Sequence, residues 1–97
     1  MYNRHMSTVK DSLKALQTIP NIGPSLAQDL YDLGYREPKD LKRQDPFAMY
    51  KKLCKKSGTR QDPCVLDTFM AAVHYADTGE ARKWWEFTPE RKETFKG

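Results

Sequence analysis

The sequence has few of the features that secreted or membrane-spanning proteins carry. Its 97 residues include two cysteines, which is too few for the disulfide framework of a small secreted domain. No apolar run approaches the roughly 18–20 residues that span a bilayer, and no signal-peptide core follows the first methionine. We therefore expect a cytoplasmic protein with reduced thiols and no membrane association.

Residue patterns that carry catalysis or hold cofactors are also missing. Cys54 and Cys64 lack the paired C-x2-C or H-x3-H spacing from which zinc sites are built. A thiol in the first turn of a helix, such as Cys64, has a depressed pKa. Its only nearby base, His74, stands ten residues on in the same expected helix, about 15 Å away. We expect the cysteines to pack in the core, and we predict no enzyme activity, no metal and no cofactor.

Proline and glycine divide the chain into pieces of helical length. Thr8 is a candidate N-cap for a helix reaching Thr18, and Asp-Pro pairs at 45–46 and 62–63 predict two further helix starts. Residues 24–33, 37–41 and 88–97 are the other expected helical pieces. Glycines are placed to end several of them at positions 34, 58 and 79.

No segment shows the period-two alternation of a strand, whereas apolar residues recur at helical spacing. Charged residues make up 31% of the chain and hydrophobic ones 38%, which indicates a charged surface around a small core. The prediction is an all-α compact bundle of five to six short helices. Residues 8–97 form its single domain, and residues 1–7 are expected to be a disordered or expression-derived segment.

The most informative segment is LQTIPNIGPSLAQDLYDLG, residues 16–34, in which a short turn joins two amphipathic helices. Gly23 stands where the backbone needs either a positive φ or a surface without Cβ. The second helix starts at once after it and offers unpaired N–H groups at the positive end of its dipole. This arrangement favours an anion, and the predicted phosphate-binding residues are Asn21, Ile22, Gly23, Ser25 and Leu26.

This turn resembles the helix-hairpin-helix family of DNA-binding motifs, which implies a helix-hairpin-helix (or SAM-like) fold and sequence-independent DNA binding. The family's hydrophobic-Gly-hydrophobic-Gly turn is matched by most of residues 19–27. Asn21 replaces the usual first glycine, and asparagine is the next-best residue at positive φ. Ser25 stands where many members carry a lysine, which removes a charge that would strengthen phosphate contact.

Beyond the hairpin, the segments DPCVLDTFMAAVHYADTG and WWEFTPERK complete a wider resemblance over residues 10–93. The chain is similar to the small bacterial Cdd1, or pathogenicity locus, proteins, some of which are labelled mitomycin-resistance proteins. It is also similar in outline to the C-terminal domain of TfoX competence regulators. The resemblance implies a DNA-binding or protein-binding unit of the bacterial cytoplasm.

Two further surfaces have alternative interpretations. An accessory nucleic-acid patch, or an ordinary solvated helix face, is formed by Lys51, Lys52, Lys55, Lys56 and Arg60. Of the adjacent Trp84 and Trp85, one is expected to cover the core and the other to be exposed, because neighbouring helical residues point about 100° apart. The acidic residues of the same region, Glu80, Glu86, Glu90 and Glu93, are interpreted as solvated charge.

The net charge of +4 permits a polyanionic partner without requiring one. The favoured prediction is weak, sequence-independent DNA binding by a protein that is not an enzyme. The alternative is a protein-interaction adapter, which would present Trp84, Trp85 and Phe87 to another protein or to a second copy of itself.

Overall fold

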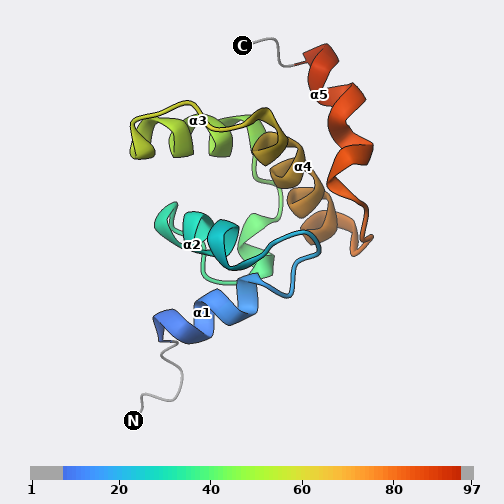
Figure 1. Ribbon diagram of the computed structural model, residues 1–97. Helices are drawn as coiled ribbons and strands as arrows, with labels where there is room; N and C mark the ends of the chain where they lie inside the picture. The colour runs from blue at the N-terminus through green and yellow to red at the C-terminus, as the bar shows by residue number, and fades with distance from the viewer. Residues whose placement is uncertain (1–7, 95–97) are drawn as a thin grey trace.

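The computed structural model describes residues 8–94, and this part of the chain folds into helices with no strand (Figure 1). In chain order the α-helices and 3₁₀ helices (η) are α1 (Val9–Leu16), α2 (Pro24–Asp32), η2 (Pro38–Leu41), α3 (Pro46–Ser57), α4 (Pro63–Thr78), η3 (Trp84–Phe87) and α5 (Thr88–Thr94). The predicted all-α class is confirmed. The predicted N-terminal segment 1–7 lies outside the described residues.

Side-chain caps begin the helices where the sequence predicts them. The Thr8 hydroxyl accepts the Asp11 N–H at 3.0 Å, and the Asp11 carboxylate accepts the Thr8 N–H at 3.4 Å. The carboxylates of Asp45 and Asp62 each accept a backbone N–H two residues on, at 2.9 Å. These bonds satisfy donors that the first helical turn leaves without an intrahelical partner.

Glycines end the two longest helices. Gly58 and Gly79 follow α3 and α4 with φ of 75° and 80°, a left-handed conformation that costs other residues about 1–2 kcal/mol. Glycine at these positions therefore stops the helix without strain, as the sequence predicts.

Three boundaries differ from the prediction. The first helix ends at Leu16, because the Thr18 N–H and hydroxyl both donate to the Ala15 carbonyl and tighten the chain into a turn. Residues 38–41 form one 3₁₀ turn, closed by the Asp40 carboxylate, which accepts two preceding backbone N–H groups at 2.9 and 3.1 Å. The 3₁₀ turn Trp84–Phe87 is not predicted by any helical spacing.

α4 is the central element of the fold. It packs against α3, η2, η3 and α5, whereas α1 and α2 pack on each other as a hairpin. The two helices that begin at the predicted Asp-Pro pairs, α3 and α4, thus pack against each other. Phe69 and Leu66 of α4 are fully buried, and they join side chains from the hairpin, η2 and α3, among them Leu16, Ile19, Leu30, Leu41 and Met49.

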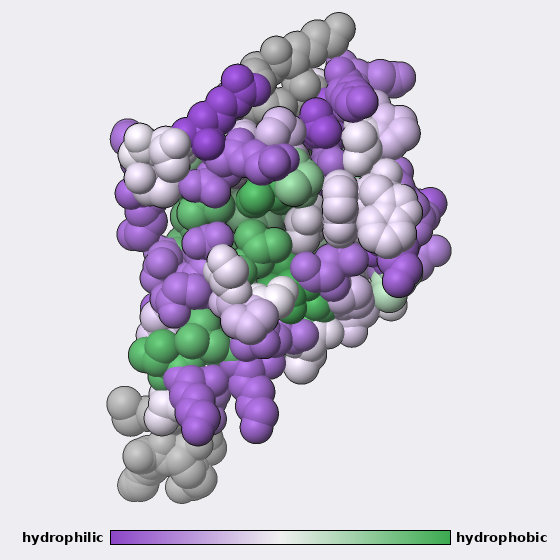
Figure 2. All heavy atoms as spheres, viewed as in Figure 1, coloured by the Kyte–Doolittle hydropathy of each residue, from purple (hydrophilic) through white to green (hydrophobic). Residues whose placement is uncertain are grey.

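The outer surface is largely polar. On the face shown in Figure 2, hydrophobic residues extend from the middle to the lower left edge, and hydrophilic ones cover most of the rest. None of the helices within residues 8–94 combines the length and the apolar character needed to cross a bilayer.

Candidate functional site

The turn between α1 and α2 is held in shape from inside the protein. Ile19 and Ile22 are 1% and 5% exposed, so both side chains anchor the turn in the core. The Ile22 N–H donates to the Ile19 carbonyl at 3.1 Å, which closes the turn. This N–H is therefore occupied, although Ile22 is among the predicted phosphate-binding residues.

Asn21 has a left-handed backbone conformation, with φ of 74°. Its side-chain amide donates to the carbonyl oxygen of Arg82 at 2.8 Å, across 61 residues of sequence. The predicted role of this amide beside an anion is thus replaced by an internal one. Asn21 ties the turn to the segment that follows α4.

Gly23 has an ordinary extended backbone, with φ of −93° and ψ of −172°. Of the two alternatives predicted for Gly23, the positive φ is therefore not the one that the structure adopts. A Cβ placed on Gly23 would meet no protein atom within 4 Å among the described residues. The other predicted alternative holds, because the surface at Gly23 has no side chain and is open to a ligand.

Three backbone N–H donors lie close together in the chain at the start of α2. Within residues 8–94, no protein acceptor bonds with the N–H groups of Gly23, Ser25 and Leu26. Gly23 and Ser25 are exposed and Leu26 is half-buried. Pro24 between them lacks an N–H and fixes the first helical residue.

The local electrostatics favour an anion at this place. The first turn of α2, which lies wholly within the described chain, carries no acidic side chain. The nearest carboxyl along the helix is that of Asp29, whose pKa is raised by burial and then by Asp32. The positive end of the α2 dipole is thus not neutralised by an adjacent acid.

A small residue, Ala27, follows these donors in α2. Ala27 is fully buried, and its N–H donates to the Gly23 carbonyl at 2.9 Å. A residue without a long side chain lets α2 lie close on α1, and this packing sets the direction of the free N–H groups.

The predicted basic face lies on a different element from the hairpin. Lys51, Lys52, Lys55 and Lys56 are all exposed on α3, whereas Leu53 between them is buried. In Figure 1, α2 lies between α1 and α3. The remaining predicted cation, Arg60, is exposed beyond the end of α3 and interacts with Tyr50.

The aromatic residues after α4 divide as predicted. Trp84 is half-buried against the core, and Trp85 is 56% exposed. Their rings meet edge to face, with centroids 5.6 Å apart and an interplanar angle of 84°. Phe87 is buried, so the predicted three-ring surface is reduced to one fully presented ring.

The structure corrects the predictions for the cysteines and for two of the acidic residues. Cys54 and Cys64 are half-buried, and burial raises the pKa of the Cys64 thiol, with the Asp62 carboxylate adding to the effect. The expected depression at a helix start is therefore reversed. Glu80 bonds with His74 at 2.6 Å, and Glu86 accepts from the Lys83 N–H at 3.0 Å and from Arg82 Nε at 3.2 Å, so both are more than solvated charge. Within the described chain no group of histidine, cysteine and acidic residues could hold a metal ion.

One buried charge was not predicted from the sequence. Asp67 is fully buried in α4, and its carboxylate accepts from Arg91 Nε at 2.8 Å, Arg91 Nη2 at 3.4 Å and the Thr88 hydroxyl at 2.6 Å. The available signal was a single carboxylate inside the most apolar helix, since a buried charge needs a partner. This cluster fastens α5 to α4.

Comparison with known proteins places nearly the whole described chain in one family. The chain is 42% identical over 82 residues to the protein named mitomycin resistance protein McrB from Streptomyces lavendulae, a match that covers 84% of this chain and 78% of that protein. No solved structure matches the chain. The family model described as "Cdd1: Pathogenicity locus" matches residues 9–93, from α1 to α5. The chain therefore belongs to the Cdd1 pathogenicity-locus family.

Proposed function

We propose that this protein binds DNA without sequence preference, by holding a backbone phosphate at the start of α2. The observation that carries the proposal is the group of open N–H donors on Gly23, Ser25 and Leu26. Helix starts with such donors favour phosphate, because the backbone N–H groups and the helix dipole act together. Contacts of this kind position a protein on DNA without reading its sequence.

The turn is also rigid enough to act as a binding site. The bond from Ile22 to Ile19 and the bond from Asn21 to Arg82 hold it without using the three open donors. The donors are therefore oriented before a ligand arrives, so binding costs little further ordering.

The binding is expected to be weak. One phosphate contact to neutral donors supplies little affinity, and the chain offers a net charge of +4 for long-range attraction. Non-specific complexes of DNA-binding proteins commonly have Kd values of about 10⁻⁴–10⁻⁶ M at physiological salt, and we expect this protein to fall in that range.

The open space around Gly23 allows a direct test. Gly23→Leu should fold normally, because the backbone there is extended and a Cβ meets nothing within 4 Å. Its side chain would stand where the phosphate approaches. We expect duplex binding, measured by fluorescence anisotropy at low salt, to weaken about 10-fold, which corresponds to one charge-assisted hydrogen-bond site.

Two matched variants complete the experiment. Thr94→Leu introduces the same side chain at an exposed position of α5, which carries neither the open donors nor the predicted basic face, and should leave duplex binding unchanged. Gly23→Ala adds a single methyl group and should weaken binding less than Gly23→Leu. Equal duplex affinity for Gly23→Leu and the unsubstituted protein, with intact helical circular dichroism, would remove the phosphate site from the turn.

A further inference from the structure

We infer that Trp85 stacks on an unpaired base, so that the preferred ligand is single-stranded DNA or DNA with exposed bases. This inference rests on the proposed DNA binding and names the class of DNA. It is carried by an exposed tryptophan, a cation beside its ring, and a hydrogen bond that joins its segment to the hairpin turn.

Trp85 is presented as a firm stacking surface. More than half of the residue is exposed, although its edge-to-face contact with the half-buried Trp84 holds the ring in place. η3, which carries both residues, packs against α4. A fixed aromatic face stacks on bases of any identity, because every base has a π-face.

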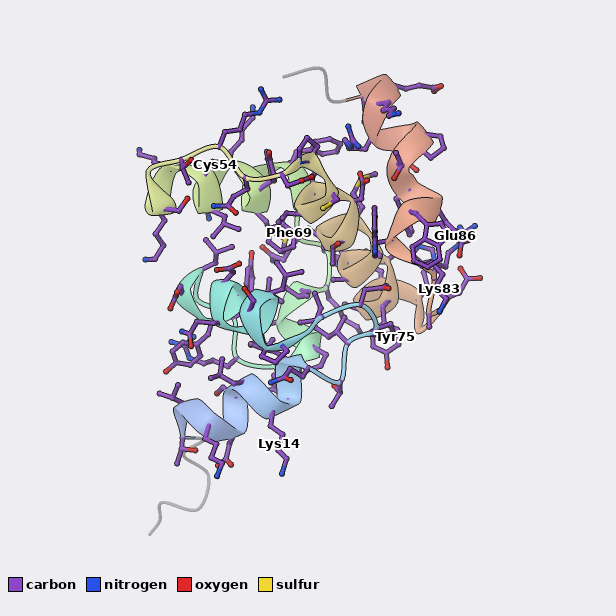
Figure 3. All side chains as sticks on the ribbon, viewed as in Figure 1. Lys14, Cys54, Phe69, Tyr75, Lys83 and Glu86 are labelled. Carbon is purple, nitrogen blue, oxygen red and sulfur yellow. The ribbon has the colours of Figure 1, made fainter. Side chains whose placement is uncertain are left out.

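The charges around the ring suit a nucleic-acid strand. The Lys83 ammonium lies 5.8 Å from the centre of the Trp85 ring. Arg82 Nε lies 3.2 Å from the Glu86 carboxylate, which offsets much of that charge. In Figure 3, Lys83 and Glu86 lie on the same edge of the molecule. Glu86 also interacts with Lys83, whose charge contributes to lowering the pKa of the Glu86 carboxyl. The two cations and one carboxylate therefore leave one net positive charge beside the ring for a phosphate that flanks a stacked base.

A hydrogen bond connects the hairpin turn to the segment that carries Trp85. Asn21 in the turn donates to the carbonyl of Arg82, and Trp85 follows three residues later. Figure 3 shows Tyr75 near the end of α4, where the turn passes the segment leading to Lys83. A DNA strand with one phosphate held at the start of α2 would therefore meet the Trp85 ring as a second contact, at a fixed position relative to the phosphate site.

A single base fits this surface better than a folded protein does. Phe87, the third aromatic residue of the region, is buried beneath Arg82, whose guanidinium lies 5.6 Å from the ring centre. Since Trp84 is half-buried, Trp85 is the one ring of the three that belongs to a residue more than half exposed. Stable protein interfaces bury about 800 Å² on each partner around a core of several large side chains, whereas stacking needs one ring.

The experiment uses the full chain with labelled oligothymidine of about 15 nucleotides and a mixed-sequence duplex of equal length, at about 50 mM salt. We expect tighter binding to oligothymidine than to duplex, together with quenching of tryptophan emission. Trp85→Ala should weaken oligothymidine binding about 10-fold and duplex binding less than about 2-fold, and Trp85→Phe should keep most of the affinity. The control is Val9→Ala, a truncation of the other exposed large hydrophobic side chain in the described chain.

The outcomes separate this inference from the proposed function. Unchanged oligothymidine binding by Trp85→Ala, or an equal loss on both ligands, overturns the stacking role even when Gly23→Leu still weakens duplex binding. Loss of self-association in Trp85→Ala with intact oligothymidine binding also overturns it, because the ring would then serve a protein contact. Conversely, a loss confined to Trp85→Ala, with Gly23→Leu unaffected, supports stacking and removes the phosphate site.

Discussion

Replacing Asp67 with alanine tests whether the C-terminal helix is fastened by a buried ion pair. The carboxylate is fully buried and is the acceptor of three hydrogen bonds from Arg91 and Thr88. Arg91 keeps 15% of its side chain exposed, and contact with Asp67 raises the pKa of its guanidinium. Asp67→Ala would leave that charge in a largely dry place without its acceptor.

The size of the effect follows from burial. Breaking a buried, hydrogen-bonded pair by removing one partner costs about 3–5 kcal/mol, whereas single domains have total stabilities of about 5–15 kcal/mol. One kcal/mol shifts the Tm of a domain of this length by roughly 4–8 °C, so a decrease of at least about 12 °C is expected. The exposed pair of Lys39 with Glu37, at 3.7 Å, provides the contrast, since Lys39→Ala should cost less than about 1 kcal/mol.

The assay is a double-mutant cycle. Urea unfolding followed by far-ultraviolet circular dichroism would be measured for Asp67→Ala, Arg91→Ala and the double variant. Because the second substitution removes the stranded charge, the double variant should be destabilised by less than the sum of the two, by about 1–3 kcal/mol. The role of the buried ion pair would be refuted by either of two results. One is a loss of unfolding free energy below about 1 kcal/mol for Asp67→Ala, and the other is strict additivity of the two single substitutions in the double variant.

Three other changes have defined outcomes. If α3 contacts DNA, the double substitution Lys55→Ala with Lys56→Ala should reduce the slope of log K against log salt by about 0.9 for each phosphate that these lysines neutralise, and an unchanged slope would exclude them from the interface. Since burial and Asp62 raise the pKa of the Cys64 thiol, iodoacetamide should modify Cys64 more slowly in the folded protein than in urea at neutral pH. Mass spectrometry of the digested protein measures the extent of modification. Faster labelling of the folded form would contradict the prediction. The backbone N–H of Lys83, the residue before η3, lowers the pKa of Glu86 below its ordinary 4.5, so the stability from this cap is present above pH 4.5 and is lost as pH falls through the lower, folded value. Tryptophan fluorescence should detect this acid transition, which Glu86→Gln should remove; an identical transition in the variant would assign it to another group.

Local signals in the sequence were sufficient for the helices. The caps at Asp45 and Asp62 bond to N–H groups two residues away, and Gly58 ends α3 through its own backbone conformation. Such features depend on neighbours in the chain, so they can be read without the fold. The left-handed conformation of Asn21 belongs to the same class. The family could be recognised in the same way, because its motifs are short and the chain carries them over residues 9–93.

The two 3₁₀ turns, η2 and η3, could not be predicted from neighbouring residues alone. Asp40 closes η2 by accepting two backbone N–H groups at once, which favours a single tight turn over a longer helix. η3 has no apolar periodicity of its own and is held by packing against α4. Short elements of this kind gain their stability from the surface that they cover, and that surface is formed by residues far away in the chain.

Interactions within a few residues set the helical class, the main helix boundaries and the position of the hairpin turn, so these features could be predicted from the residues alone. The tertiary structure decided which N–H groups stay open, through the bond from Asn21 to Arg82 across 61 residues, and which charge is buried, through the pair of Asp67 with Arg91. It also decided that Trp85 is the presented ring while Phe87 is buried. These properties depend on how distant helices pack, because burial and long-range hydrogen bonds exist only after the chain has closed on itself.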